Sequence, residues 1–151
     1  MHAGAFSQAA FFWRKRALCR FYTIAQPLPS QATATPENRL EKGIAVQAEI
    51  FGEGVRTAWQ KSHINRWLAE NCFGDYYTRT GLDLKQREMI PFSFLMAQGG
   101  CEPQLIAHVR GNINLGNDRD FFMRVVSQCL PYLRYPRSLN AIACINKAAE
   151  P

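Results

Sequence analysis

The stretch GGCEPQLIAHVRGNINL, residues 99–115, decides the fold, because it contains a helix that the rest of the chain must cover. Residues of its inner face recur at three- and four-residue steps, namely Leu105, Val109, Asn112 and Ile113. This periodicity predicts a helix over residues 103–115. In such a helix Gln104, His108 and Asn112 lie along one face, because they are four residues apart.

The polar stripe on this helix predicts a small-molecule site. Cys101 lies seven residues before His108, near the mouth of the same face. A thiol, two amides and an imidazole on an otherwise apolar helix are typical of a ligand pocket that has a few polar groups. The alternative is that His108 is a core or interface histidine whose hydrogen bonds are satisfied within the protein.

The segment before this stretch predicts a second, more deeply buried helix. Asp83 and Gln86 have the spacing of a capping box, which predicts that a helix begins after Asp83. Residues 89–97 are apolar on nearly every side and favour a buried central helix. Pro91 removes a backbone donor inside it, which predicts a kink or a break. We expect Glu88, at the edge of this apolar segment, to be partly buried.

Helical periodicity continues on both sides of these two segments. Helices are predicted over residues 38–52, 62–72, 118–130 and 137–145, with Asn117 as the N-cap of the third. The second of these has an apolar stripe formed by Ile64, Trp67, Leu68 and Cys72. Pro131 and Pro136 bracket a predicted break at residues 132–135. About six helices and no strand predict an all-α domain.

Composition excludes several classes of partner. The chain has 151 residues, of which 47% are hydrophobic and 20% charged, as is typical of one globular domain. Its net charge is +6, but residues 1–36 hold four basic residues and no acid, which leaves 14 basic and 12 acidic residues in the remainder. These interleaved charges argue against a nucleic-acid partner. No apolar run reaches the roughly 18 residues that a membrane-spanning helix needs.

Residues 1–36 differ in composition from the rest and are interpreted as an extension of the domain formed by residues 37–151. A leader that contains arginine and no acid resembles a transit peptide. The alternative is a disordered or misassigned upstream segment. We therefore expect a cytoplasmic protein, or an organellar or exported one if the leader is a targeting segment.

Cysteine and histidine usage argues against structural metal or disulfide chemistry. The five cysteines are widely spaced and form no CxxC pair, which is typical of a protein in a reducing compartment. Only three histidines occur, and none belongs to a cluster of ligands. We expect no metal and no cofactor.

Several segments resemble the carboxymuconolactone decarboxylase family, which shares its helical fold with the alkylhydroperoxidase D proteins. The segments are Arg87-Glu88, GGCEPQ at residues 99–104, HVRGNINLGN at 108–117 and LPYLRYPRSLNA at 130–141, with FGD at 73–75 and LDLK at 82–85. The resemblance covers roughly residues 38–149. It implies an alkylhydroperoxidase D-like domain that assembles into trimers or hexamers.

The activity that the resemblance implies is a carboxy-lyase reaction of aromatic catabolism on γ-carboxymuconolactone or a related small acid. Such a reaction needs a proton donor and an apolar pocket, and no cofactor. His108 is the candidate general acid and base, and Glu88 would orient it or shuttle its proton. Gln104 and Asn112 are candidate ligands of the lactone or of a carboxylate, and Arg134 is a candidate partner of a substrate carboxylate.

Two other functions stay open. In the alkylhydroperoxidase D proteins a CxxC pair precedes the histidine, and here Cys101 occupies the first thiol position while Gln104 occupies the second. The resemblance therefore also allows a peroxiredoxin-type activity in which Cys101 reduces peroxide with an external thiol. The third function is a helical oligomer that binds a ligand without turnover. Arg134 supports it, because it occupies a corner where the family often has small residues.

Overall fold

The computed structural model describes residues 29–150, and from Gln31 onward these residues belong to one compact unit, Gln31–Pro151. Most of the predicted extension, residues 1–28, lies outside the described residues. The described part begins with α2 (Arg39–Phe51), two short 3-10 helices η1 (Glu53–Val55) and η2 (Ala58–Lys61), α3 (His63–Trp67) and the π-helix η3 (Leu68–Tyr77). It continues with α4 (Leu84–Gln98), α5 (Glu102–Asn114) and α6 (Arg119–Ala148).

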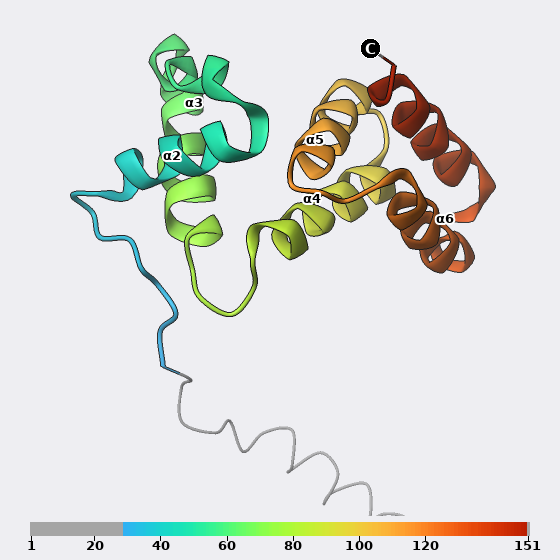
Figure 1. Cartoon of the computed structure of the whole chain (residues 1–151), viewed down its shortest axis with the longest axis horizontal. Helices are drawn as coiled ribbons and strands as arrows, with labels where there is room; N and C mark the ends of the chain where they lie inside the picture. Colours follow the sequence, from blue (N-terminus) through green and yellow to red (C-terminus); the bar gives the residue numbers. More distant parts are fainter. Residues whose placement is uncertain (1–28, 151) are drawn as a thin grey trace, which may run out of the picture. The chain divides into compact units, whose positions relative to one another are not determined.

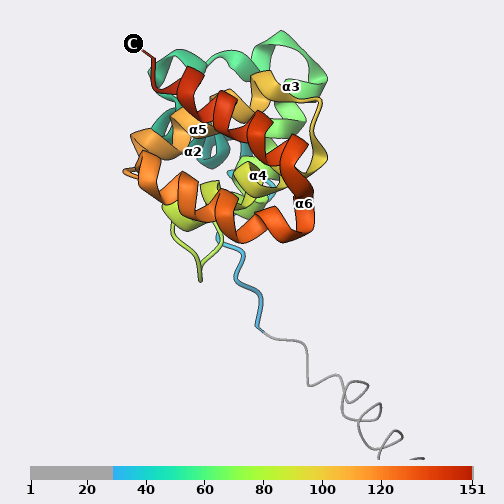
Figure 2. The ribbon, with the colours of Figure 1, turned by 90° about the vertical axis from the view of Figure 1, so that its right-hand side faces the viewer.

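The all-α fold class is confirmed, since residues 29–150 contain helices and no strand. Each predicted helix has a counterpart, because α3 continues directly into η3 and α6 is bent into two arms (Figure 2). No helix in the described part of the chain is long and apolar enough to cross a membrane.

The hydrophobic core lies between α4, α5 and α6, which pack against one another (Figure 1). Its buried side chains come from all three helices and are Phe92, Met96, Leu105, Val109, Phe122, Val126, Ala141, Cys144, Ile145 and Ala148. The predicted inner face of residues 103–115 is thus the face that α5 buries, except that Ile113 is 41% exposed.

The second layer consists of α2 packed on η3, and two glycines allow the close approach. A Cβ atom at Gly43 would lie 1.9 Å from the carbonyl oxygen of Ala69, and one at Gly74 would lie 2.2 Å from that of Arg39. Real Cβ atoms do not approach backbone oxygens so closely, so both positions require glycine. This packing holds η3, and with it Tyr77, against α2.

Helix α4 begins as predicted and continues further than predicted. The capping box of Asp83 and Gln86 is present in full. Of the kink or break predicted at Pro91, the break is wrong, because the helix continues through Pro91 to Gln98. Burial on every side is also wrong, because Glu88, Phe92 and Met96 form one buried stripe while Phe94 on another face is 70% exposed.

Helix α6 confirms the predicted break and corrects its predicted start. Asp118, and not Asn117, caps the helix by accepting a hydrogen bond from the backbone nitrogen of Phe121 at 2.7 Å. Between the two prolines, Arg134 has non-helical φ and ψ angles of 65° and 171°, and the two arms meet there. Asn117 is buried, and its side chain donates to the side-chain oxygen of Asn112.

Three of the four residues in the predicted apolar stripe of residues 62–72 are exposed, and Cys72 is half-buried. Ile64, Trp67 and Leu68 are 57%, 64% and 45% exposed. Helix α3 has only five residues and continues directly into η3. Its exposed side is not covered by another described element.

Candidate active site

A buried glutamate and a partly exposed histidine form the centre of the site. Glu88 lies on the buried stripe of α4 and is 0% exposed. His108 lies in the middle of α5, and its Nδ1 is 2.7 Å from Oε2 of Glu88. The side chain of His108 is 20% exposed. The structure therefore brings together two of the three candidate catalytic residues.

Tyr77, the last residue of η3, binds the other oxygen of the same carboxylate. Its hydroxyl group donates to Oε1 of Glu88 at 2.7 Å. Burial raises the pKa of Tyr77, and the negative charge of Glu88 and the hydrogen bond to it raise that pKa further. Tyr77 therefore keeps its proton and acts as a donor.

Aromatic rings close the other side of the site. Phe51 at the end of α2 meets the His108 ring edge to face, with centroids 5.4 Å apart. Phe51 also meets Phe73, and Phe73 packs on Tyr77 with centroids 4.7 Å apart. Phe51, Phe73, Tyr77, Glu88 and His108 thus form a closed circuit of contacts, in which the carboxylate is fully buried and its hydrogen bonds are strengthened by the low local dielectric.

Asn112 and Asn117 fix the positions of α4 and α5, the helices that bear Glu88 and His108, relative to each other. The side-chain amide of Asn112 donates to the backbone oxygens of Glu88 and His108, at 2.9 and 2.8 Å. Its own oxygen accepts a hydrogen bond from Asn117 at 2.8 Å. Asn112 is 0% exposed, and both hydrogens of its amide are used within the fold. It thus has no hydrogen left for a substrate, contrary to the predicted binding role.

The free nitrogen of His108 faces the outside of the circuit. Nε2 makes no hydrogen bond to the described residues, and it is not one of the buried polar atoms without a partner. It is therefore open to solvent or to a bound molecule. Since Glu88 takes the Nδ1 side, Nε2 is the atom that can give or take a proton.

The remaining predicted site residues lie at different distances from the pair. Gln104 is exposed and lies one turn before His108 on α5, where it can reach a molecule at Nε2. Cys101 is the N-cap of α5, and its thiol donates to the backbone oxygen of Leu95 at 3.4 Å. Seven residues, or about 10 Å of helix, separate Cys101 from His108.

Arg134 lies at the far end of α4 from the pair. Arg137, in the same bend of α6, donates to the backbone oxygen of Gln98, which places the bend beside the last turn of α4. Gln98 is ten residues from Glu88, or about 15 Å along the helix. Within one chain, Arg134 is not brought to the histidine.

Tyr77 and Cys72 are two neighbours of Glu88 that the sequence patterns did not predict. Burial raises the pKa of the Cys72 thiol, and the charge of Glu88 raises it further, so this thiol is held in its neutral form. The available signal was the FGD segment at residues 73–75, which belongs to the family resemblance and lies between these two residues.

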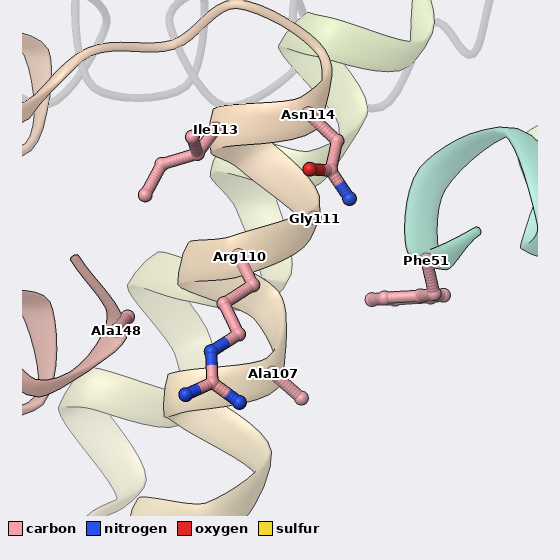
Figure 3. Close-up of a pocket in the computed structure, with 7 residues that line it drawn as sticks. All are labelled: Phe51, Ala107, Arg110, Gly111, Ile113, Asn114 and Ala148. Atoms are coloured by element: carbon pink, nitrogen blue, oxygen red, sulfur yellow. The ribbon is translucent and has the colours of Figure 1, made fainter. Parts of the chain in front are cut away.

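A surface pocket of about 400 Å³ is lined by α5 together with the ends of α2 and α6 (Figure 3). Its lining consists of Phe51, Ala107, Arg110, Gly111, Ile113, Asn114 and Ala148. Phe51 belongs both to this pocket and to the ring contact with His108. A Cβ atom at Gly111 would lie 2.7 Å from Ile50 and 2.9 Å from Phe51, so the glycine allows Phe51 to pack on α5.

Comparison with known proteins supports the resemblance seen in the sequence. The family described as the carboxymuconolactone decarboxylase family matches residues 63–147, which is more than half of the chain and includes Tyr77, Glu88 and His108. Comparison with individual curated proteins gives no match. In residues 29–150 no group of three histidine, cysteine or acidic side chains gathers as metal ligands would.

Proposed function

This chain belongs to the carboxymuconolactone decarboxylase family, and from that membership we propose that it is a cofactor-independent lyase. Its substrate would be a small carboxylated lactone or a related acid. One observation carries the proposal: Nδ1 of His108 is bound at 2.7 Å to a carboxylate that is 0% exposed, while Nε2 stays open. This arrangement is that of a general acid and base oriented by a buried partner.

In the proposed reaction the bond between the substrate carbon and its carboxylate breaks, and carbon dioxide leaves. The electron pair moves into the conjugated lactone, where the apolar surroundings of Phe51 favour its delocalisation. The imidazolium form of His108 then gives the proton on Nε2 to the carbon and recovers one from solvent. An imidazole with an unperturbed pKa of about 6.5 can do both near neutral pH. Glu88 stabilises the imidazolium during this cycle.

Gln104 supports the proposal as a binding residue. It lies on α5 one turn before the histidine, and its exposed amide offers both a donor and an acceptor to a lactone or a carboxylate. A substrate held there would have its reacting carbon near Nε2. Replacing Gln104 by alanine should therefore raise KM more than it lowers kcat.

A thiol-dependent peroxidase is the weaker candidate. The thiol of Cys101 donates to Leu95, and about 10 Å of helix lies between Cys101 and His108. Cys72 lies closer to the glutamate, but burial and the Glu88 charge raise its pKa and disfavour the reactive thiolate. Neither thiol is arranged for attack on a peroxide.

The test is an ultraviolet assay of γ-carboxymuconolactone turnover by the purified chain, beside His108→Ala and Cys101→Ser. The lyase proposal predicts that the parent and Cys101→Ser consume the lactone and that His108→Ala loses about 10² to 10⁴ of the rate. Equal rates for the parent and His108→Ala would contradict it. No turnover by the parent would remove this substrate, and peroxide reduction with an external thiol would then be measured.

We also propose that the protein is a homo-oligomer. The exposed apolar face of Ile64, Trp67 and Leu68 supports this, because contiguous apolar surface on a small domain marks an interface. Light scattering after size-exclusion chromatography should give a multiple of the chain mass. Trp67→Glu should lower that mass, and a monomeric parent would refute the proposal.

A reducing compartment such as the cytoplasm is the proposed location. Cys72, Cys101, Cys129 and Cys144 are all free thiols in the described part of the chain. Such thiols persist where glutathione and thioredoxin keep them reduced. Fractionation of cells that express the full chain tests this, and recovery in an oxidising compartment would contradict it.

A further inference from the structure

The hydrogen bond from Tyr77 to Glu88 has a consequence for the histidine on the other side of the carboxylate. Each oxygen of Glu88 has one side-chain partner: Oε1 has the hydroxyl group of Tyr77 and Oε2 has Nδ1 of His108, both at 2.7 Å. The Tyr77 ring is fixed by its packing on Phe73, and the segment η3 that bears it is locked to α2. The hydroxyl group is therefore held in place independently of the histidine.

We propose that Tyr77 is a positioning residue of the acid–base site, which sets the tautomer of His108 by binding Oε1 of Glu88 and leaving Oε2 as the acceptor for Nδ1. The proposal rests on the proposed function, because it assigns Nε2 of His108 as the proton-transfer atom. Since Tyr77 donates its only proton, Glu88 must accept it on Oε1. In the proposed arrangement Oε2 accepts in turn from Nδ1, so Nδ1 of neutral His108 carries the hydrogen and Nε2 carries the lone pair.

Removal of the hydroxyl group would leave Oε1 of a fully buried carboxylate without a donor. A buried acceptor without a partner is costly, and more so when it is charged. Among the described side chains no other donor binds the carboxylate: Asn112 donates to the backbone oxygen of Glu88, and Arg87 donates to backbone oxygens of Arg79, Thr80 and Leu82. Removal of a donor from the carboxylate favours the form of Glu88 that donates from Oε2.

A protonated Glu88 reverses the hydrogen bond to the histidine. Its hydroxyl group would donate to Nδ1, and the neutral ring would then carry its hydrogen on Nε2. A ring in that tautomer cannot accept a proton at the open nitrogen. Tyr77 would thus affect the reaction through two intermediate groups, without touching the substrate.

The direct test is long-range proton–nitrogen correlation by nuclear magnetic resonance on the ¹⁵N-labelled full chain at about pH 8, where a reference imidazole is neutral. The His108 signals are identified by their loss in His108→Gln. The matched control for Tyr77→Phe is Tyr76→Phe, which removes the hydroxyl group of the neighbouring, 53% exposed tyrosine in the same π-helix.

The proposal predicts that the parent and Tyr76→Phe show a protonated Nδ1 and an unprotonated Nε2, and that Tyr77→Phe shows the opposite tautomer or a mixture. A Tyr77→Phe spectrum with the parental tautomer would overturn the proposal, as would a parent with its hydrogen on Nε2. A merely structural tyrosine would change stability without changing the tautomer.

The functional measurement separates this proposal from the lyase proposal. With γ-carboxymuconolactone, kcat of Tyr77→Phe should fall about tenfold or more with little change in KM, because a hydrogen bond to a charged group is lost. If the parent shows the expected tautomer and no turnover, only the lyase proposal fails. If the parent turns over the lactone and Tyr77→Phe keeps both rate and tautomer, only the role of Tyr77 fails.

Discussion

Replacing Arg134 by glycine is expected to stabilise the protein, although the change removes a whole side chain. Arg134 is the one residue other than glycine with a positive φ in the described part of the chain, and its φ of 65° and ψ of 171° fall in a region that is essentially restricted to glycine. Its side chain is exposed and makes no hydrogen bond or ion pair with the described residues. The substitution removes strain and few contacts.

The magnitude follows from two opposing terms. A residue held in such a conformation costs about 1–3 kcal/mol, which glycine would recover. Glycine also gains freedom in the unfolded chain, which offsets about 0.5–1 kcal/mol of this. The net stabilisation is about 0–2.5 kcal/mol, with a centre of about 1 kcal/mol. For a domain of this size that central value corresponds to a rise in Tm of roughly 4 °C.

Thermal and urea unfolding of the parent, Arg134→Gly and Arg124→Gly measure the effect. Arg124 is the matched control, because it is an exposed arginine within the regular part of the same helix. There the change to glycine should destabilise by about 0.5–1 kcal/mol, so the two variants should shift Tm in opposite directions. If Arg134→Gly lowers Tm as Arg124→Gly does, the strain at the bend is absent and the reasoning is refuted.

Three further predictions concern packing and protonation. Gly74→Ala should destabilise the protein by at least about 1–3 kcal/mol in urea unfolding, because its Cβ would lie 2.2 Å from the backbone oxygen of Arg39. The control Gly54→Ala, whose Cβ would meet nothing within 4 Å, should not destabilise it in this way. Equal effects of the two substitutions would contradict the packing of α2 on η3. Cys72 should react with iodoacetamide at pH 8 more slowly than an unfolded cysteine, since its pKa is raised, and an equal rate would count against its burial beside Glu88. The pKa of Tyr77 in the folded state is raised above its unfolded value of about 10, so its contribution to the free energy of unfolding should be complete below pH 10 and decline above it. Tyr77→Phe should remove this part of the loss of stability at alkaline pH. Identical dependence of stability on pH in the parent and the variant would show that the phenol titrates normally.

Local patterns in the sequence were sufficient for the helices. The capping box of Asp83, the periodicity of residues 103–115 and the prolines around the α6 bend each depend on neighbours within a few residues, and all three are observed. Two local predictions are wrong, the break at Pro91 and the N-cap at Asn117. The other errors concern packing. Phe94 was expected to be buried because residues 89–97 are apolar on nearly every side, but burial is decided by which face another helix covers.

The site could be predicted only in part, for the same reason. His108 and Glu88 came from the resemblance and from their place in apolar helices, and the structure joins them by a hydrogen bond. Tyr77 could not be placed beside Glu88 from spacing, because the contact depends on a π-helix and a loop between them. Asn112 shares a helical face with His108, but the stripe passes from the surface into the core, so the asparagine supports the fold.

The most direct test of the central claim, that the buried Glu88–His108 pair transfers the proton, is kcat for γ-carboxymuconolactone in Glu88→Gln compared with the parent. The amide keeps the size of the carboxylate and removes its charge, and far-ultraviolet circular dichroism checks that the variant is folded. We predict that kcat falls by about tenfold or more, because the imidazolium loses its buried counter-charge. A folded Glu88→Gln variant that turns over the lactone at the parental rate would contradict the account.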